Sequence, residues 1–317
     1  MTVKEWVAFW QKNYDVPGVR HTTYEAHRYV LENHILPWIG DCPLESLTTQ
    51  KIERFLEEHQ LDGNKRNGKP LSQQTMRHIQ NLLSKVLRQA ATHGLIERNP
   101  VQGICCSASK KVKATILADN EVRDYLSAAE ELGYLPIFLL ALEYGLRQRE
   151  LIALMWGDLD IENCTLTIHE GRAVAYRNLI EYEGRVRKLL LSQYAVEQLV
   201  REHRKHPSSQ ILFIHPGTLR PYSPQMIRRL HRLVLEHAGL GYVRFEDLRH
   251  TYAVRALRRG EDVKTLAHLL GYGKTVDFRK QYHSWIYSYR EVEANPQEEL
   301  CEAAEKIGTW FESITNV

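Results

Sequence analysis

Apolar residues at helical spacing dominate the first hundred residues, and this periodicity constrains the fold more than any other feature. Ser72–Thr92 carries a stripe of apolar residues that is expected to be buried, namely Ile79, Leu82, Leu83, Val86 and Leu87. Such spacing puts the apolar side chains on one face of an α-helix. Val3–Asn13 and Thr22–Asn33 repeat the pattern, the latter being expected to stop before Pro37, and Thr48 is expected to cap a further helix. Residues 1–104 therefore predict a helical bundle with its own core.

From residue 115 onward, short strands are mixed with helices. Helices are expected at Asp119–Leu132, Leu135–Tyr144, Gln148–Trp156, Gln193–His206, Ser223–Ala238, Glu246–Arg259, Val263–Leu270 and Thr275–His283. Strands are expected at Thr165–His169, Leu179–Glu183 and Val186–Leu191. Glu183 and Gly184 suit a tight hairpin turn between the last two strands. The expected fold class is mainly α with a small antiparallel β-sheet.

Length and composition narrow the class of protein. The 317 residues leave room for two domains, and 43% hydrophobic with 26% charged residues is a globular composition. No apolar run approaches the roughly 18 residues of a membrane span, and the N-terminus lacks a secretory pattern. Five cysteines, with Cys105 and Cys106 adjacent, match neither a disulfide framework nor a zinc site. We therefore expect a cytoplasmic protein with reduced thiols and no membrane partner.

Charge is distributed unevenly along the chain. The net charge is only +3, yet residues 291–317 hold seven acidic residues and one lysine, which leaves +9 on residues 1–290. A basic body is compatible with a polyanionic partner. Residues 105–114 predict a basic linker that lies near phosphate, with an ordinary solvated linker as the alternative. The lysines of this linker are Lys110, Lys111 and Lys113.

Three short segments carry two arginines and a tyrosine in a fixed order. Arg147 lies in Gly-Leu-Arg-Gln-Arg-Glu, Arg249 in Asp-Leu-Arg-His-Thr-Tyr-Ala, and Tyr282 in Gln-Tyr-His. Two guanidinium groups can hold a phosphate, and a phenol can attack it. A lone arginine is more often a surface residue, and a lone tyrosine is more often a core residue with a tied hydroxyl. The combination favours metal-free cleavage of a DNA backbone.

These segments resemble the tyrosine recombinases, also called the phage integrase family. The segments His34-Ile35-Leu36-Pro37 and Ile96-Glu97-Arg98-Asn99-Pro100 extend the resemblance into the bundle. It implies a helical core-binding (SAM-like) DNA-binding domain at 1–104, a linker at 105–114, and a tyrosine-recombinase catalytic domain at 115–293. The resemblance further implies a site-specific recombinase or mobile-element integrase that works through a covalent 3′-phosphotyrosyl intermediate.

The resemblance also assigns roles and partners. Tyr282 is the expected nucleophile, with Tyr287 and Tyr289 as alternatives, while Arg147 and Arg249 hold the phosphate. The phosphotyrosyl bond conserves energy, so neither a metal nor a nucleotide cofactor is expected. The expected partners are double-stranded DNA, three further copies in a homotetramer on paired sites, and a directionality factor as a candidate. Because the bundle begins almost at the first residue, no separate arm-binding module is expected.

The acidic tail, residues 294–317, shows helical periodicity. Its apolar face carries Leu300, Ala303, Ala304, Ile307 and Phe311. An amphipathic terminal helix needs a partner surface, which is either its own catalytic domain or a neighbouring copy. The resemblance favours docking on the neighbour.

Three positions depart from the family pattern. Glu246 stands where the family usually has a histidine, three residues before Arg249, and Tyr272 stands where it has histidine or tryptophan. Glu246 can accept the tyrosine proton but repels phosphate, whereas Tyr272 keeps a hydrogen-bond donor. The family lysine before Val186 is not evident, and Arg185 or Lys188 is the candidate for protonating the leaving group. Arginine is the poorer acid, because its pKa exceeds about 12.

These departures leave several functions open. The chain is either an active recombinase with a variant site or a degenerate one that binds DNA without cutting. The retained arginines and tyrosine favour activity, and His250 is expected to pack and hydrogen-bond rather than act as an acid or base. A topoisomerase-like nicking enzyme and a helical protein–protein scaffold are the further alternatives. Product topology separates relaxation from recombination.

Overall fold

The computed structural model describes residues 1–16, 21–62, 69–104, 113–175, 178–181 and 184–288. The chain divides into two compact units, Met1–Val112 and Lys113–Val317. The division falls inside the expected linker, of which Lys113 is described and exposed, while Lys110, Lys111 and the acidic tail lie outside the described residues. In the part of the chain that the structure describes, no helix is long and apolar enough to cross a membrane.

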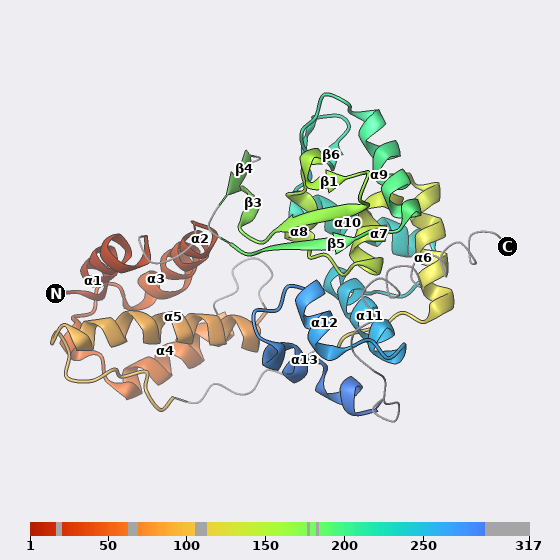
Figure 1. Ribbon diagram of the computed structural model, residues 1–317. Helices are drawn as coiled ribbons and strands as arrows, with labels where there is room; N and C mark the ends of the chain where they lie inside the picture. Colours follow the sequence, from red (N-terminus) through yellow and green to blue (C-terminus); the bar gives the residue numbers. More distant parts are fainter. Residues whose placement is uncertain (17–20, 63–68, 105–112, 176–177, 182–183, 289–317) are drawn as a thin grey trace. The chain divides into compact units, whose positions relative to one another are not determined.

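Unit 1 is a bundle of helices around one apolar core (Figure 1). Its elements are α1 (Val3–Trp10), η1 (Gln11–Asp15), α2 (His21–Val30), η2 (Leu31–Ile35), α3 (Leu36–Ile39), η3 (Leu44–Ser46), α4 (Thr49–Asp62) and α5 (Gln73–Thr92). Thr48 Oγ1 accepts the Lys51 amide at 3.2 Å, and Ser72 Oγ accepts the Thr75 amide at 3.1 Å. These caps satisfy first-turn amides and confirm the expected starts of α4 and α5.

The helical path of α2 continues through Pro37, so the expected stop before that residue was wrong. The five-residue π-helical turn η2 follows α2, and α3 then begins at Leu36 with Pro37 in its first turn. Proline is tolerated there, because the amides of a first turn have no partner inside their own helix. The turn also leads Leu31 and Ile35 into the core, where both are fully buried.

Unit 2 is a larger helical body with small antiparallel sheets (Figure 1). Its helices are α6 (Asp119–Glu131), α7 (Leu135–Glu143), α8 (Gln148–Ile152), η4 (Trp156–Asp158), α9 (Gln193–Lys205), α10 (Pro224–His237), α11 (Phe245–Arg258), α12 (Val263–Leu269) and α13 (Thr275–Ser288). All nine residues of α7 are buried, so it forms the centre of the unit. The expected helices agree with this order, and α8 ends earlier than predicted.

The main sheet contains three strands in the order β1 (Leu159–Asp160), β2 (Thr165–His169) and β5 (Val186–Leu190). Two-stranded ribbons pair β3 (Arg172–Ala175) with β4 (Asn178–Glu181), and β6 (Ile214–His215) with β7 (Arg220–Pro221). The expected hairpin between β4 and β5 was therefore wrong. A Cβ added to Gly184 would lie 2.3 Å from the Gly171 nitrogen, so this glycine permits close backbone approach rather than a hairpin turn.

The last three described helices share a separate apolar cluster. Its buried members include Tyr252 and Val254 of α11, Leu270 after α12, and Phe278 and Tyr282 of α13. This packing places α13 against α11, which carries Arg249 and His250. The three helices lie together at the lower side of unit 2 in Figure 1. The three segments singled out in the sequence thus meet in one unit.

Candidate active site

Arg147 is positioned by the helix that it begins. It is the N-cap residue of α8, and Glu150 occupies the first turn of that helix. Glu150 Oε2 accepts the Arg147 backbone amide at 2.8 Å, and Oε1 accepts Nη1 at 2.9 Å. The Arg147 side chain keeps 24% exposure, whereas that of Glu150 is 2% exposed. The carboxylate therefore anchors a guanidinium that solvent, or a ligand, can still reach.

Arg249 is buried and is held by main-chain carbonyls. Its Nη1 donates to the Gly145 carbonyl at 2.6 Å and its Nη2 to the Leu270 carbonyl. Among the described residues, no carboxylate forms an ion pair with it. Burial, and then the neighbouring Arg147, lower the pKa of Arg249. A buried cation without a carboxylate partner is a typical sign of an anion site.

Tyr272 connects the two arginines with the helix of Tyr282. The Cζ atom of Arg249 lies 5.4 Å from the centre of the Tyr272 ring, and that of Arg147 lies 5.9 Å away. Both guanidinium groups thus lie within cation–π distance of the same aromatic ring. The Tyr272 hydroxyl donates to Gln281 Oε1 at 2.7 Å. This bond ties the turn after α12 to α13.

Tyr282 lies at a kink in α13 and is 2% exposed. Its ring packs on Phe278 with a centroid distance of 4.6 Å, and its Oη lies 2.8 Å from Nδ1 of His250. Burial and then the nearby Tyr272 raise the pKa of the Tyr282 phenol, against an opposite effect of Arg249 and Arg147. The phenol is therefore protonated at neutral pH and needs a proton acceptor before it can attack.

His250 is suited to accept that proton. Burial lowers its pKa, against the opposing charge of Asp247, while Arg244 and Arg249 lower the pKa further. The ring is consequently neutral near pH 7, and the tautomer with an unprotonated Nδ1 accepts the hydrogen of Tyr282. The expectation that His250 packs and hydrogen-bonds agrees with this contact, but the sequence did not identify Tyr282 as the partner, because the two residues are 32 positions apart.

Glu246 and Arg185, two further residues that the sequence predicted for the site, are both exposed. Glu246 is exposed on the first turn of α11, on the same side of the helix as Arg249 and His250. Arg185 is 62% exposed, and its Nε lies 3.3 Å from Glu170 Oε2. A Cβ added to Gly273 would lie 2.7 Å from Arg185 Nη1, so this guanidinium reaches the turn that contains Tyr272.

Lys188 and Arg187 point to opposite faces of β5. The strand alternates between exposed and buried residues, with Lys188 exposed and Arg187 buried. Lys188 therefore points away from the buried face, on which Arg187 meets Glu150, and this geometry does not support it as the acid of the site. Sequence reasoning considered Arg185 and Lys188 but missed Arg187, which lies between them. The signal available in the sequence was the alternation of the predicted strand, which places Arg187 on the same side as Leu189, toward the interior.

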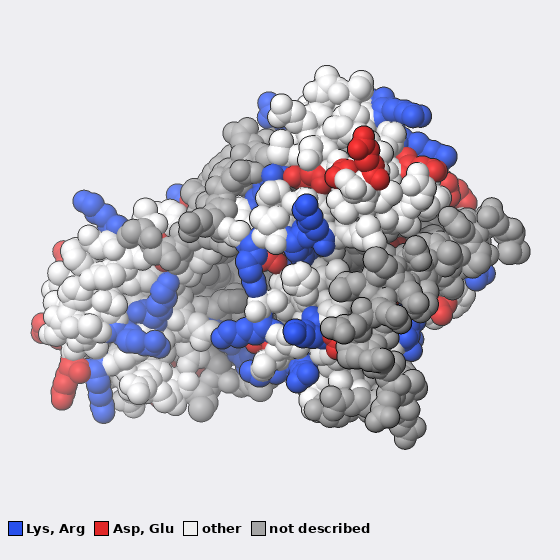
Figure 2. All heavy atoms as spheres, viewed as in Figure 1, with Lys and Arg blue, Asp and Glu red and all other residues white. Residues whose placement is uncertain are grey.

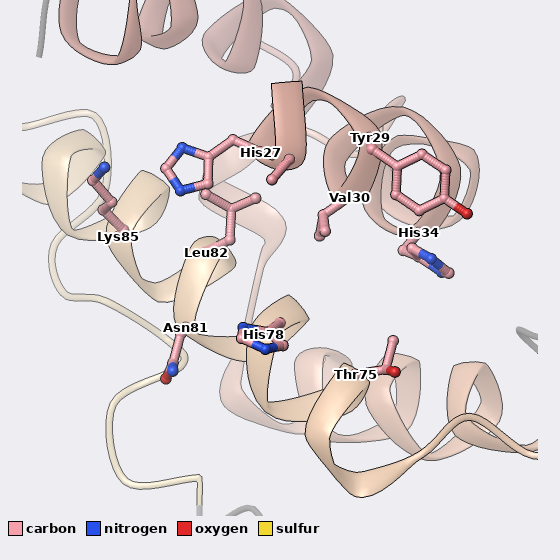
Figure 3. Close-up of a pocket in the computed structure, with 10 residues that line it drawn as sticks. His27, Tyr29, Val30, His34, Thr75, His78, Asn81, Leu82 and Lys85 are labelled. Atoms are coloured by element: carbon pink, nitrogen blue, oxygen red, sulfur yellow. The ribbon is translucent and has the colours of Figure 1, made fainter. Parts of the chain in front are cut away.

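Unit 1 holds a cavity of about 490 Å³ between the α2–η2 segment and α5. Figure 3 shows side chains from both segments around it, with His78, Asn81 and Lys85 on α5. No carboxylate lines the cavity, and the 20 residues of α5 contain no Asp or Glu. Lys85 Nζ and His27 Nδ1 both approach the buried Asp15 Oδ1, at 3.7 and 2.7 Å. The lining of α5 is thus rich in donors, and Asp15 partly offsets the charge of its lysine, Lys85.

Basic side chains also gather on unit 2. Figure 2 shows them over β5, α12 and α13, on the side that Figure 1 presents to the viewer. The exposed basic residues of these elements and the adjoining turns are Arg185, Lys188, Lys264, Lys274, Arg279 and Lys280. A surface of this kind attracts a polyanion.

A helical body with two clustered arginines beside a buried tyrosine defines the class of tyrosine recombinases. The chain belongs to the phage integrase family, because the model of that family matches residues 115–284. The model of the phage integrase N-terminal SAM-like domain matches residues 2–59. The family that the sequence resembles is thereby confirmed, and so is the expected fold class.

Known relatives agree with this assignment. A tyrosine recombinase XerC-like protein of Caldanaerobacter subterraneus subsp. tengcongensis is 24% identical over 284 residues, covering 78% of this chain and 70% of the relative. The ICEBs1 integrase of Bacillus subtilis is 22% identical over 301 residues, covering 90% of this chain and 77% of the relative.

Solved structures of low sequence identity share the fold. The Tn1549 transposon integrase in complex with a circular intermediate DNA aligns with a TM-score of 0.73 at 18% identity, over 96% of this chain and 99% of that one. A lambda integrase dimer bound to a COC′ core site aligns with a TM-score of 0.68 at 21% identity, over 87% and 97%.

Proposed function

We propose that this protein is a site-specific DNA recombinase of the integrase type, which cleaves and rejoins DNA through a covalent 3′-phosphotyrosyl intermediate. The observation that carries the proposal is the convergence of Arg147 and Arg249 on the ring of Tyr272, which is hydrogen-bonded to the helix of Tyr282. The Arg249 cation has no carboxylate ion-pair partner within the described residues and would be neutralised by a phosphate. The recombinase names of the relatives support the same activity.

The proposed cleavage step uses residues of unit 2 alone. Arg147 and Arg249 bind the non-bridging oxygens of the scissile phosphate and stabilise the charge of the pentacoordinate transition state. Tyr282 Oη forms a bond to phosphorus while the bond from phosphorus to the 5′-oxygen breaks. The phenol proton passes to His250 or Glu246, and the leaving 5′-oxygen takes a proton from water or from Arg185. Rejoining reverses these transfers, so no ATP is required.

The nucleophile must first become accessible. Tyr282 is 2% exposed, and its hydroxyl is bonded to His250. Its φ of −107° and ψ of 18° interrupt the regular geometry of α13, so a shift of the helix at this residue breaks few helical hydrogen bonds. We propose that DNA binding induces such a shift and turns Tyr282 toward the phosphate held by the arginines.

DNA binding and assembly complete the proposal. The cavity-lining face of α5 in unit 1 and the basic surface of unit 2 each bind the sugar–phosphate backbone, and Lys113 adds a contact at the start of unit 2. A lambda integrase tetramer bound to a Holliday junction, which aligns with a TM-score of 0.68, supports a homotetramer on paired sites. A directionality factor and docking of the acidic tail on a neighbouring copy remain part of the proposal.

The test is covalent trapping on a nicked suicide substrate that contains the target site. The wild-type protein should form an adduct that resists denaturation, and Tyr282→Phe should form none while keeping its DNA affinity. Binding of the wild-type protein without any adduct would instead support the non-cleaving alternative. Relaxation of a supercoiled circle that lacks a second site would support a topoisomerase-like enzyme. An adduct from Tyr282→Phe would move the nucleophile to another residue, with Tyr287 and Tyr289 tested next.

A further inference from the structure

We propose that Arg187 is a positioning residue, which orients Arg147 through Glu150 and fixes the turn that carries Tyr272. The inference rests on the proposed function and names a residue that the sequence did not single out. Arg187 is the second residue of β5, its side chain is 3% exposed, and it is therefore out of reach of DNA. Any effect on catalysis must pass through the residues that it contacts.

The first contact is with the carboxylate of Glu150. Oε1 accepts Arg187 Nη1 at 3.1 Å as well as Arg147 Nη1 at 2.9 Å. Oε2 accepts Arg187 Nη2 at 2.9 Å as well as the Arg147 amide at 2.8 Å. Each carboxylate oxygen thus receives one hydrogen bond from each arginine, which uses the roughly four acceptor sites that a carboxylate offers. The orientation of the Glu150 carboxylate, and hence of Arg147, is fixed from both sides.

The second contact is with the turn after α12. Arg187 Nε donates to the Leu269 carbonyl at 2.9 Å, while Arg249 Nη2 donates to the next carbonyl, that of Leu270. Two arginines from different elements therefore hold consecutive carbonyls just before Tyr272. A Cβ added to Gly271 would lie 2.8 Å from Arg187 Nη1, so the guanidinium packs directly on the turn. The turn cannot shift without disturbing Arg187.

Electrostatics explains why a cation is required at this place. Burial alone would raise the pKa of Glu150, but the hydrogen bonds and charges of Arg187 and then Arg147 outweigh it, so the pKa is lowered. Without Arg187, Arg147 would be the only cation within ion-pair distance of this carboxylate among the described residues. Its guanidinium would then serve Glu150 and would be less available to a phosphate. Because Arg187 neutralises part of the Glu150 charge, the guanidinium of Arg147 remains available to bind a phosphate.

The experiment compares Arg187→Gln and Arg187→Lys with the control Arg172→Gln. Arg172 forms a different buried ion pair in unit 2, with Asp158, so its loss should destabilise the fold without reaching Arg147. Single-turnover cleavage is measured on two suicide substrates, one with a normal scissile phosphodiester and one with an uncharged methylphosphonate. Thermal unfolding and DNA affinity are measured in parallel. The methylphosphonate has less need of a correctly placed guanidinium, because it lacks the phosphate charge.

Arg187→Gln should lower phosphodiester cleavage by about 10- to 100-fold, the scale on which a misplaced charge-stabilising group acts, and methylphosphonate cleavage by much less. Arg187→Lys should recover part of the loss, since it restores the charge but not the fork. Arg172→Gln should lower thermal stability and leave the ratio of the two rates at the wild-type value. A wild-type ratio in Arg187→Gln and Arg187→Lys overturns the inference and assigns Arg187 to the fold alone. Absence of any adduct from the wild-type protein overturns the proposed function, and the inference with it.

Discussion

The contact between Tyr282 and His250 makes a prediction about the proton acceptor. Replacing His250 by Gln keeps a polar side chain of similar size but removes a group that can be protonated. The Oη–Nδ1 distance of 2.8 Å is already that of a proton-transfer pair. Loss of a general base lowers a rate by about 10²- to 10⁴-fold, or roughly 3–5 kcal/mol in the activation barrier. Single-turnover cleavage of a suicide substrate measures this loss directly.

The pH dependence gives the prediction a sign. Burial lowers the pKa of His250. The charges that face it come from Asp247 and Arg249 on its own helix and from Arg244 at the N-cap, while the neutral phenol of Tyr282 faces it from α13. Cleavage by the wild-type protein should therefore rise with pH below about 6.5 and be level near neutrality. In His250→Gln, hydroxide must remove the phenol proton, so the rate should rise about tenfold per pH unit between neutrality and the raised pKa of Tyr282.

The same lowered pKa makes a stability prediction. The unfolded chain binds a proton at His250 below about pH 6.5, whereas the folded chain does so only at lower pH. The stabilising contribution of the neutral histidine is present above about pH 6.5 and is lost as the pH falls from there through the lower pKa of the folded chain. The unfolding free energy of the wild-type protein should fall more steeply with decreasing pH than that of His250→Gln, as chemical denaturation at several pH values would measure.

Glu246→Gln is the matched control, because this residue lies on the same side of α11 and is exposed. If His250 is the acceptor, the control should keep the wild-type pH profile. The reasoning is refuted if His250→Gln cleaves at the wild-type rate with an unchanged profile, in which case His250 only packs. A faster His250→Gln would show instead that the histidine restrains Tyr282, and a flattened profile in Glu246→Gln would assign the proton to the carboxylate.

Three further changes test the site and the DNA-binding face. Arg249→Lys should lower cleavage about 10²-fold in the trapping assay, because lysine lacks the fork that joins the Gly145 and Leu270 carbonyls. Gly145→Ala should lower the unfolding free energy by about 1–3 kcal/mol in chemical denaturation, since φ is +63° and the added Cβ would lie 2.5 Å from Leu270 Cδ2. Lys85→Ala should reduce the salt dependence of DNA binding by about one phosphate contact, whereas Arg54→Ala, on α4 outside the cavity, should not.

Local patterns were sufficient to predict most of the helices. The caps at Thr48 and Ser72 and the apolar stripe of α5 depend only on residues within a few positions of one another. Arg147 and Arg249 were identified for the same reason, because each lies in a distinctive short segment. That they meet at Tyr272 follows from the family resemblance rather than from periodicity.

Strand pairing was beyond such patterns. β5 pairs with β2 rather than with the preceding strand. In the sequence, Gly184 suggested a hairpin turn, whereas in the structure it permits close approach to Gly171. Because the pairing of β5 was not predicted, the position of Arg187 in the site was not predicted either. Arg187 could be recognised only once its register on β5 placed it inside, opposite Glu150. Contacts of high sequence separation depend on the packing of whole elements, which no short segment encodes.

The departures that the resemblance predicts at Glu246 and Tyr272 have a common electrostatic interpretation in the structure. Buried arginines make the main contacts inside the site. Arg187 donates hydrogen bonds to the Glu150 carboxylate, whereas Arg249 donates to main-chain carbonyls and not to a carboxylate. Carbonyl dipoles orient a guanidinium without cancelling its charge, so the buried site keeps a positive potential that favours a phosphate. A carboxylate at Glu246 is tolerable because it is exposed and water screens its repulsion. The phenol of Tyr272 offers an aromatic ring to both guanidinium groups, where a protonated histidine would repel them.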